Sequence, residues 1–361
     1  MYADHLIANL MPLMREGDSM ILVIQGDDIR IAEAVKGNAN VDVVKIPSRI
    51  FRNRALLLGF EQLVLPVIAL LGHADLIHSL HYTHPLLAFT RRVVTIHDLT
   101  FVLFPELHTR GRRLIMPFFI RRAIKHAEAV IFVSSATQKD AERLFPASHN
   151  MKSVIPLGVE PVLANVEKDD QAILSELGLE RPFLLFIGTL EPRKNIVRIV
   201  HAFERIADRH PEITFILAGK LGWHTDEIVS AIEQSPTRFR IHLLGFIDAQ
   251  QKAALLRSCL MLVYPSLYEG FGLPVLEAMA VGAPVITSNL SSMPEVAGDA
   301  ALLVDPTSVE QLVDAMEHII RNAVLAKQLS DAGPTQASLF TWDRAARLTL
   351  SLYRDVVQRR S

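Results

Sequence analysis

The chain has 361 residues, of which 50% are hydrophobic and 21% are charged, and its formal net charge at pH 7 is −2. This balance is typical of a globular protein and gives no reason to expect a nucleic-acid partner. Because one hydrophobic core rarely organises so long a chain, two domains are expected. The single cysteine, Cys259, excludes an internal disulfide and a cysteine metal site and favours a cytosolic setting.

No secretory signal or membrane span is visible in the sequence. The most apolar run, residues 63–72, is too short to cross a bilayer and contains Pro66. We interpret it as a buried helix.

Apolar runs that alternate with helical patterns predict parallel sheets covered on both faces. In the first half of the chain the predicted strands are 20–26, 41–47, 74–79, 92–98, 129–134 and 152–158. Helical patterns separate most of them, for example at 51–71, 110–127 and 135–145. These elements predict one Rossmann-like domain.

A polar stretch, residues 159–182, is typical of a linker followed by one short helix. A second set of apolar runs follows it, at 183–189, 213–219, 241–246, 259–265, 283–288 and 301–306. These runs predict a second Rossmann-like domain. In such sheets ligands bind beyond the carboxyl ends of the strands, so the loops there are where chemistry is expected.

The loop after the run 259–265 has the features of an anion site. It carries Glu269, Gly270 and Gly272 and leads into a helix that contains Glu277. Glycines allow positive φ and close approach of the backbone, and a helix start leaves N–H groups that attract phosphate. A simpler interpretation is that the two glutamates are favourable charges near a helix N-terminus.

Two cations stand at the end of the predicted strand 183–189. Arg193 and Lys194, within "GTLEPRKN", are suited to neutralise a diphosphate held at the neighbouring helix start. An isolated Arg-Lys pair is usually only solvated. Beside an anion pocket on the same edge of the sheet, the binding role is favoured.

These segments resemble glycosyltransferase family 4, the retaining GT-B enzymes. "YEGFGLPVLEAMAVGAP" is similar to the family's E-x7-E motif, with Glu269 and Glu277 as the two carboxylates. "GTLEPRKN", "VIPLGVE", "LGFIDAQQKAALLRSC", "PVITSNLSSMPEVAGDAALLVDP" and "TIHDLTFVLFPE" resemble other family segments in the same order. The likeness covers nearly the whole chain.

The resemblance implies the GT-B fold, an α/β fold in which two Rossmann-like domains face each other across a cleft. The expected acceptor-side domain comprises residues 1–160 plus 341–361, because the carboxyl-terminal helix crosses back to it. The expected donor domain comprises 161–340. The family's first strand is missing before the helix at 2–14, which indicates a late start assignment or a remodelled acceptor side.

The resemblance also implies roles for the site residues. Glu277 is expected to accept hydrogen bonds from the donor ribose, and Glu269 to face hydroxyls of the transferred sugar. Arg193 and Lys194 are expected to stabilise charge on the leaving diphosphate. Many members carry Gly-Arg where this chain has Gly188-Thr189, so one usual cation is missing here and Arg193 is expected to compensate. The expected donor-binding residues are Gly188, Gly219, Phe246, Gly270, Phe271, Gly272, Leu273 and Glu277.

In the first domain, His97 matches the family's histidine beside the transferred sugar, and Asp98 is expected to orient it or balance its charge. The alternative is a structural histidine. Nearby His78, His81 and His84 suggest zinc, but no further ligand pattern accompanies them, so an acceptor-side lining is favoured. No Asp-x-Asp pair occurs in the chain, which favours catalysis without a metal, and no other cofactor is expected.

Together these observations predict retaining, metal-independent transfer of a hexosyl unit, mannose from GDP-mannose as the first hypothesis. The expected acceptor is a glycan or a lipid-linked molecule of surface-polysaccharide synthesis. Two other functions stay open: a GT-B sugar-nucleotide epimerase and a catalytically silent sugar-nucleotide binder. A nicotinamide dehydrogenase is disfavoured because no G-x-G-x-x-G follows an early strand.

The segment 110–126 interleaves arginines with large apolar residues. One interpretation is contact with an anionic membrane, which implies a cytoplasmic protein that is peripheral on the inner face of the plasma membrane. The other is a helix with a core-facing stripe and a solvated basic face.

Overall fold

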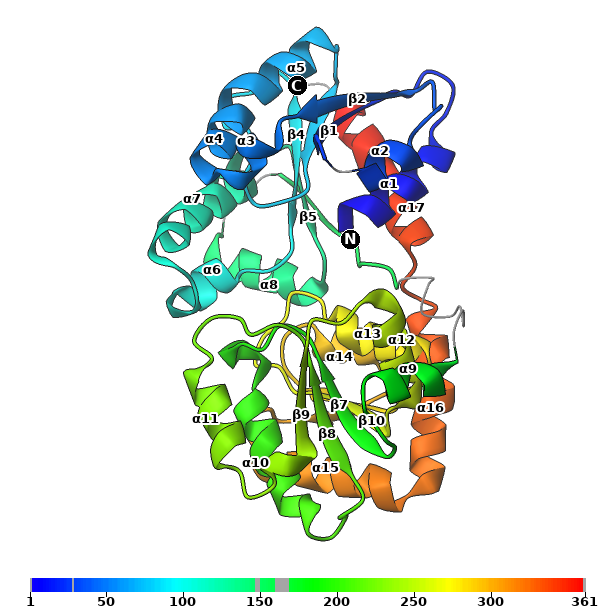
Figure 1. Cartoon of the computed structure of the whole chain (residues 1–361). Coiled ribbons are helices and arrows are strands. Elements are labelled where there is room, and N and C mark those ends of the chain that lie inside the picture. Colours follow the sequence, from blue (N-terminus) through cyan, green and yellow to red (C-terminus); the bar gives the residue numbers. More distant parts are fainter. Residues whose placement is uncertain (1, 28, 147–149, 160–168, 360–361) are drawn as a thin grey trace. The chain divides into compact units, whose positions relative to one another are not determined.

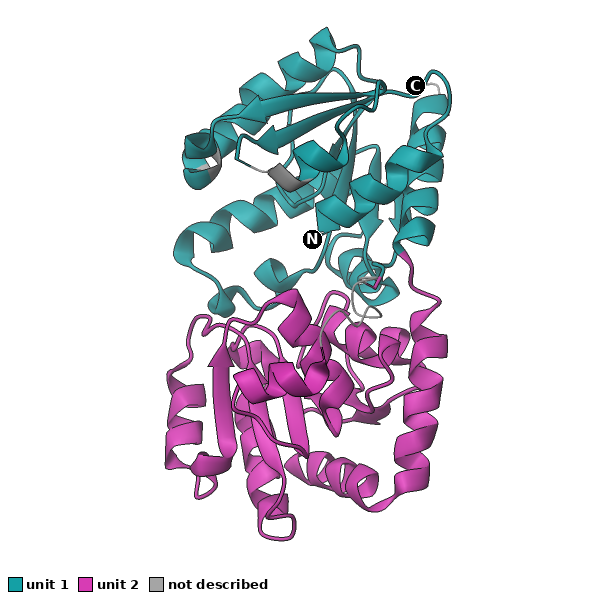
Figure 2. Cartoon of the chain, turned by 45° about the vertical axis from the view of Figure 1, so that its right-hand side comes forward, with its two compact units in different colours: residues 1–158, 342–361 teal, residues 159–341 magenta. Residues whose placement is uncertain are grey.

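The computed structural model describes residues 2–27, 29–146, 150–159 and 169–359. The chain divides into two compact units, residues 1–158 with 342–361 (unit 1) and residues 159–341 (unit 2) (Figure 2). The predicted boundaries at 160/161 and 340/341 lie within two residues of this division. Most of the predicted linker, residues 160–168, lies outside the described residues.

All six strands predicted in the first half are present, and the pairs are parallel, but they form two sheets instead of one. Strands β1 (Met20–Gln25) and β2 (Val41–Ile46) pair only with each other. A separate sheet has the order β3-β4-β5-β6. Its strands are β3 (Leu76–Ser79), β4 (Arg91–Ile96), β5 (Ala129–Phe132) and β6 (Met151–Val154).

The helices of unit 1 surround these sheets (Figure 1). They are α1 (Tyr2–Leu10), α2 (Ile29–Ala34), α3 (Ser48–Arg52), α4 (Arg54–Gly59), the π-helical turn η2 (Phe60–Val64), α5 (Leu65–Leu71), α6 (Thr100–Leu103), α7 (Arg110–His126) and α8 (Ser135–Leu144). Short 3-10 turns lie at Met11–Leu13 (η1) and Pro105–Leu107 (η3). Side-chain caps mark helix starts: Asn53 accepts hydrogen bonds from the backbone of Ala55 and Leu56, and Ser134 from that of Thr137.

The interpretation of residues 63–72 as a buried helix is wrong. The segment is helical, but Leu63 and Leu71 are each 74% exposed, and Val64, Val67 and Leu70 are also exposed. Apolar composition indicates a need for burial but does not identify what covers the residues. The helix therefore presents an apolar face that no described part of its unit covers.

The predicted return of the carboxyl-terminal helix is confirmed. Helix α17 (Trp342–Gln358) belongs to unit 1, where Ala346 packs with Leu6 and Leu10 of α1. The rings of His5 and Trp342 stack with centroids 5.2 Å apart. A long amphipathic helix at the end of the chain thus completes the unit that the chain begins.

Unit 2 contains one parallel sheet of six strands in the order β12-β11-β10-β7-β8-β9. All six match predicted strands: β7 (Phe183–Ile187), β8 (Thr214–Ala218), β9 (Ile241–Gly245), β10 (Met261–Tyr264), β11 (Val285–Ser288) and β12 (Leu302–Val304). Every residue of β7, β10 and β11 is buried, as expected for strands with helices on both faces.

Helices cover both faces of this sheet, with α10 and α11 on one side and α9, α12 and α13 on the other (Figure 1). Their bounds are α9 (Asp170–Glu176), α10 (Ile196–Ala207), α11 (Asp226–Gln234), α12 (Ala249–Ser258), α13 (Leu273–Ala280), α14 (Met293–Ala297), α15 (Val309–Arg321) and α16 (Ala323–Ala337). The 3-10 turns η5 (Pro192–Lys194) and η6 (Arg238–Arg240) complete the unit. Within the described parts of both units, none of the helices combines the length and apolarity needed to cross a bilayer.

Candidate active site

Two loops meet at the carboxyl edge of the sheet of unit 2. Strands β7 and β10 are parallel neighbours, with Leu184 opposite Met261, so the loops that follow them lie side by side. The backbone N–H of Leu267 donates to the carbonyl of Arg193 at 2.9 Å. Asn195, in the left-handed region at φ 65°, donates its side-chain amide to the carbonyls of Pro265 and Pro306. The two loops are therefore fixed to each other.

Ion pairs between these loops form a closed group, which we call the Glu269 cluster: Glu191, Arg193, Lys194, Tyr264 and Glu269. The Glu269 carboxylate lies 2.5 Å from Lys194 Nζ and 2.8 Å from Arg193 Nη1. Arg193 Nη2 lies 2.5 Å from Glu191 Oε1, and Lys194 Nζ lies 2.5 Å from the Tyr264 hydroxyl. All members except Arg193 are buried, and Arg193 has a side chain only 16% exposed.

The electrostatics of the cluster keep the Glu269 carboxylate and the Arg193 guanidinium charged. Burial alone would raise the pKa of Glu269, but Lys194 and Arg193 outweigh it and lower the pKa to about 2. Burial lowers the pKa of Lys194, and the Glu269 carboxylate opposes that shift. Burial and the Glu269 charge raise the pKa of Tyr264 far above its usual range, so its hydroxyl is a neutral hydrogen-bond partner.

The turn between the two predicted glutamates is rigidly supported. Gly272 has φ 108°, a backbone conformation that residues with a side chain rarely adopt, so glycine is strongly favoured there. The Ser292 hydroxyl donates to the carbonyls of Glu269 at 3.0 Å and Phe271 at 2.8 Å. Phe271 is buried against Phe340, with ring centroids 5.7 Å apart. The helix start is therefore held in one position.

Helix α13 begins at Leu273, and its N-cap residue Gly272 supplies no side-chain hydrogen bond to the first backbone N–H groups. Glu277, one turn further on, is buried. Its carboxylate lies 2.7 Å from Nζ of Lys252, which comes from α12. Each predicted glutamate is thus paired with a lysine from another element.

The remaining predicted donor-binding residues lie at the ends of β7, β8 and β9. The backbone N–H of Gly188 donates to Ala218 and that of Gly219 to Gly245. A Cβ at Gly219 would lie 1.9 Å from the carbonyl oxygen of Gly188, so these loops can approach only through glycine. Beyond them Phe246 is 71% exposed, with Lys220 Nζ 4.7 Å from its ring centroid. An exposed aromatic ring is available there for stacking.

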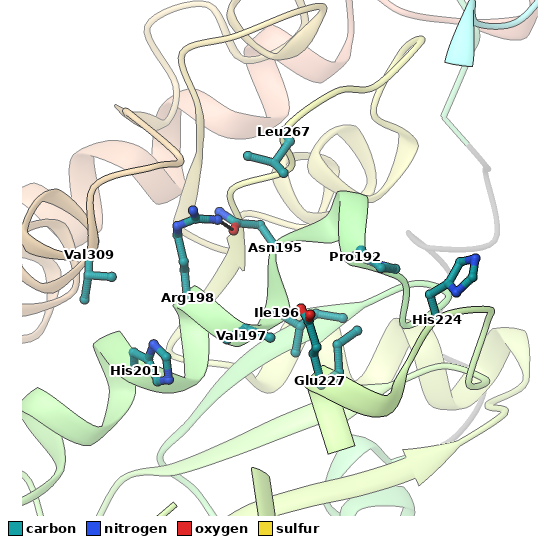
Figure 3. Close-up of a pocket in the computed structure, with 11 residues that line it drawn as sticks. Pro192, Asn195, Ile196, Val197, Arg198, His201, His224, Glu227, Leu267 and Val309 are labelled. Atoms are coloured by element: carbon teal, nitrogen blue, oxygen red, sulfur yellow. Dashed lines mark hydrogen bonds between the residues drawn. The ribbon is translucent and has the colours of Figure 1, made fainter. Parts of the chain in front are cut away.

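A separate cavity of about 440 Å³ opens beside the start of α10 (Figure 3). It is lined by Pro192, Asn195, Ile196, Val197, Arg198, His201, His224, Glu227, Ile228, Leu267 and Val309. Its walls come chiefly from α10 and α11, whereas Glu277 and Lys252 come from α13 and α12 on the other face of the sheet. None of the predicted site residues lines it, so it is a different feature.

In unit 1, His97 follows β4, and its Nε2 lies 2.8 Å from the carbonyl oxygen of Leu80. Because a carbonyl only accepts, Nε2 carries the hydrogen and Nδ1 is the acceptor of the neutral ring. Burial lowers the pKa of His97, and the nearby Asp98 charge opposes that shift only in part. Asp98 itself accepts hydrogen bonds from the backbone and hydroxyl of Thr100, so it also fixes the start of α6.

The three neighbouring histidines have different partners. His78 lies 2.5 Å from the Tyr353 hydroxyl and 2.8 Å from Thr95 Oγ1, whereas His84 lies 3.2 Å from the carbonyl oxygen of Tyr82. The ring of His81 lies 5.8 Å from that of His97. No group of three potential metal ligands occurs among the residues that the structure describes.

The structure brings Arg193, Lys194 and Glu269 together, as the sequence suggested, and adds three residues that the sequence analysis missed. Glu191 and Tyr264 complete the Glu269 cluster, and Lys252 pairs with Glu277. Glu191 lies in the motif that drew attention to Arg193, and Tyr264 ends the predicted strand before the loop. No local signal marks Lys252.

Comparisons with known proteins show the family to which the chain belongs. Residues 168–336 match the family model described as glycosyl transferases group 1, and residues 7–163 match glycosyltransferase family 4. The chain is 30% identical over 268 residues to O-antigen chain mannosyltransferase B of Escherichia coli, covering 73% of this chain and 70% of that protein. It is 28% identical to the serotype-specific mannosyltransferase WbdA of Escherichia coli over 74% of this chain, but it spans only 34% of WbdA.

The fold is similarly matched. The structure of HepE from Anabaena, solved in complex with UDP and glucose, superposes with a TM-score of 0.74 at 18% identity, covering 98% of this chain and 96% of that one. That likeness shows the GT-B fold. The chain therefore belongs to glycosyltransferase family 4 and is a hexosyltransferase of group 1.

Proposed function

We propose that the protein transfers a mannosyl unit from GDP-mannose to a glycan or lipid-linked acceptor, with retention of configuration and without a metal ion. In this reaction the bond from the sugar C1 to the diphosphate oxygen breaks, and a bond from C1 to the acceptor oxygen forms on the same face. The proton of the acceptor hydroxyl goes to the released diphosphate. No protein nucleophile takes part.

The observation that carries the proposal is the Glu269 cluster beside the start of α13. The diphosphate is assigned to the backbone donors of Phe271, Gly272 and Leu273, with Gly270 giving the loop room to approach. Arg193 and Lys194 stabilise the charge that grows on the leaving group. Glu269, ionised at neutral pH, accepts hydrogen bonds from the sugar hydroxyls.

The cluster has no net charge, because Glu191 and Glu269 balance Arg193 and Lys194. These cations therefore attract a diphosphate less strongly than an arginine and a lysine without acidic partners would. Arg193 is the member with the more exposed side chain, at 16%, so we assign to it the reorientation towards the diphosphate when the donor binds. Lys194 stays with Glu269 and Tyr264, holds the carboxylate in place and adds its positive charge near the leaving group from that position.

Glu277 and Phe246 are assigned to the nucleoside. An ionised carboxylate suits the two ribose hydroxyls, and Lys252 orients it. The exposed ring of Phe246, at the ends of the strands, is suited to stack on the base, and Gly188 and Gly219 keep the edge between them free of side chains.

In unit 1 we assign His97 to the transferred sugar and Asp98 to the position of that histidine. A neutral imidazole that donates through Nε2 to Leu80 keeps Nδ1 as an acceptor for a sugar hydroxyl. Mannose is assigned because two relatives of the chain, O-antigen chain mannosyltransferase B and WbdA, are mannosyltransferases. The name of the first relative also suggests the class of acceptor. A GDP-mannose donor implies a cytoplasmic enzyme.

A panel of sugar nucleotides tests the proposal. GDP-mannose is expected to raise the melting temperature most, because a ligand that binds only the folded state stabilises it by mass action. Mannosyl transfer, and not free mannose or an epimerised donor, is expected when an acceptor extract is added. Stabilisation by a different sugar nucleotide refutes the donor assignment, and an epimerised product from donor alone refutes transfer.

A further inference from the structure

The apolar stripe on α4, η2 and α5 has no partner among the residues of unit 1 that the structure describes. Leu56 lies in α4, before the π-helical turn, and Leu63, Val67 and Leu70 follow at intervals of four and three residues, which places these three on one side of the helix. The four side chains are 50%, 74%, 49% and 51% exposed, and Val64 and Leu71 beside them are also exposed. Side chains of this size are rarely grouped on a surface that stays in water.

A neighbouring loop adds two further apolar side chains. Leu87 is 85% exposed and Phe89 is 86% exposed. The loop is fixed to η2, because Gln62 donates to the carbonyl of His84 and accepts from the backbone of Leu86. Partly buried hydrogen bonds therefore hold the loop that carries these apolar residues at the surface.

Helix α7 adjoins the same loop. The His84 ring lies edge-on to Phe119, with centroids 5.6 Å apart, and Arg92 donates to the carbonyls of Leu86 and His126. Figure 1 shows α4 and α7 on the same side of unit 1. The stripe, the loop and α7 therefore belong to one region of the surface.

The exposed face of α7 combines apolar and basic residues. Leu114, Phe118, Arg121 and Lys125 follow intervals of four, three and four residues, so they lie along one side of the helix, and all are exposed. The helix contains five arginines, one lysine and no acidic residue, which gives a charge of +6 without its histidine. Its exposed apolar residues thus lie among cations.

We call the combined surface the apolar-basic face: the exposed apolar residues of 54–71, Leu87, Phe89 and the exposed face of α7. It carries eleven of the 21 large apolar side chains that are exposed in the described part of the chain. The segment 48–72 has one acidic residue, Glu61, whose carboxylate accepts from the Thr83 hydroxyl at 3.0 Å and whose pKa is raised by burial. Negative charge is therefore scarce across the whole surface.

We propose that the apolar-basic face docks unit 1 on an anionic phospholipid bilayer. The leucine and phenylalanine side chains enter the boundary between headgroups and acyl chains, and the cations of α7 lie among the lipid phosphates. Charge selects this occupant over a second copy of the chain, because two copies would bring α7 cations together, whereas an anionic bilayer neutralises them. The surface shares no residue with the donor site. The docking proposal and the proposed reaction can therefore be refuted separately.

Co-sedimentation of the full chain with vesicles tests the docking, with no sugar nucleotide present. We expect binding to vesicles of phosphatidylcholine mixed with phosphatidylglycerol, little binding to phosphatidylcholine alone, and weakening by salt. Arg121→Gln with Lys125→Gln is expected to weaken binding at least about tenfold, since each basic residue near a charged membrane contributes substantially. Leu71→Ser with Phe89→Ser is expected to weaken it to a similar extent. All four side chains are exposed, so folding, checked by circular dichroism, is expected to be retained.

Matched controls come from unit 2. Phe239 is 78% exposed and Arg205 has a side chain 51% exposed, so Phe239→Ser and Arg205→Gln remove an apolar and a basic group outside the face. We expect both to bind vesicles as the original chain does. Equal losses in the control and test variants, or equal binding to both kinds of vesicle, overturn the proposal. It is also overturned if sedimentation velocity shows a dimer that the test variants abolish, because the occupant is then a second copy.

Discussion

Removal of the Glu269 charge is the sharpest test of the cluster. The pKa of Glu269, about 2, lies roughly 2.5 units below the ordinary 4.5. This shift corresponds to a stabilisation of the folded state by about 3 kcal/mol. Because the pKa is lower in the folded state, this stabilisation is complete above about pH 4.5 and is lost as the pH falls towards 2. Glu269→Gln is therefore expected to reduce the free energy of unfolding by about 3 kcal/mol at pH 7, and the variant should lose less stability between pH 4.5 and 2.

Lys194→Met supplies the second half of the test. It leaves Glu269 with Arg193 as its remaining cation, and breaking a buried pair typically costs about 3–5 kcal/mol. In the double variant, Glu269→Gln with Lys194→Met, no lone charge of this pair stays buried, so part of the stability is expected to return. Urea unfolding measures the free energy of unfolding of the two single variants and of the double variant. The control is Lys327→Met, which breaks an exposed pair with Asp331 and should cost less than about 1 kcal/mol.

Turnover separates the catalytic role from the structural one. Each single variant is expected to reduce kcat at least about 100-fold, the size of effect seen when one electrostatic group of an active site is lost. The double variant should stay as slow as the slower single variant although it is more stable. If its activity recovers together with its stability, Glu269 and Lys194 only support the fold, and the assigned roles are refuted.

Three further outcomes are expected at the donor site. Activity should survive EDTA, and an enzyme that stops on chelation and recovers with manganese contradicts a metal-independent reaction. Phe246→Ala should weaken donor binding by about tenfold, the scale of one lost stacking contact, with kcat at saturating donor unchanged; titration calorimetry measures it, and Phe239→Ala is the control. Glu277→Gln should raise the donor KM more than it lowers kcat in steady-state assays, and an unchanged KM contradicts its assignment to the ribose.

The elements of this fold could be predicted because buried parallel strands appear as short apolar runs. The segment 129–134, for example, contains β5, whose four residues are all buried. The partners of each strand were harder to predict. Nothing local distinguishes β2, which pairs only with β1, from a strand of the main sheet of unit 1. Sheet membership depends on contacts between distant segments, which one sequence does not display.

The same limit applies to the site. Arg193, Lys194 and Glu269 were found because each lies in a loop at the end of a predicted strand. Lys252 was missed because its pairing with Glu277 depends on the packing of α12 beside α13, and the two residues are 25 positions apart. Likewise, the apolar segment 63–72 indicated burial, although its large apolar side chains at 63, 64, 67, 70 and 71 are left exposed by the described part of unit 1.

Because unit 1 contains buried histidines, we expect acid to lower its free energy of unfolding. Burial lowers the pKa of His78 to about 3 and that of His84 to about 4, from an ordinary value of 6.5. Since both bind a proton more readily in the unfolded chain, stability is lost as the pH falls below about 6.5. At pH 4.5 each histidine lowers the free energy of unfolding by about 2.5 kcal/mol, and the two together lower it by about 5 kcal/mol. This loss is comparable with the whole stability of many domains.

Tryptophan fluorescence can follow this loss in unit 1 alone. The chain has two tryptophans, and Trp342 is the one in unit 1, so Trp223→Phe leaves a single reporter there. Replacing both His78 and His84 with asparagine, which does not titrate, is expected to make the loss of stability between pH 6.5 and 4.5 clearly smaller, whatever its effect at pH 7. Leu71→Asn, at an exposed position of the same unit, changes no titrating group and should leave the pH dependence unchanged. If the double variant follows the pH dependence of its parent, these histidines are not the acid-sensitive groups, because a side chain without a titrating proton cannot produce that slope.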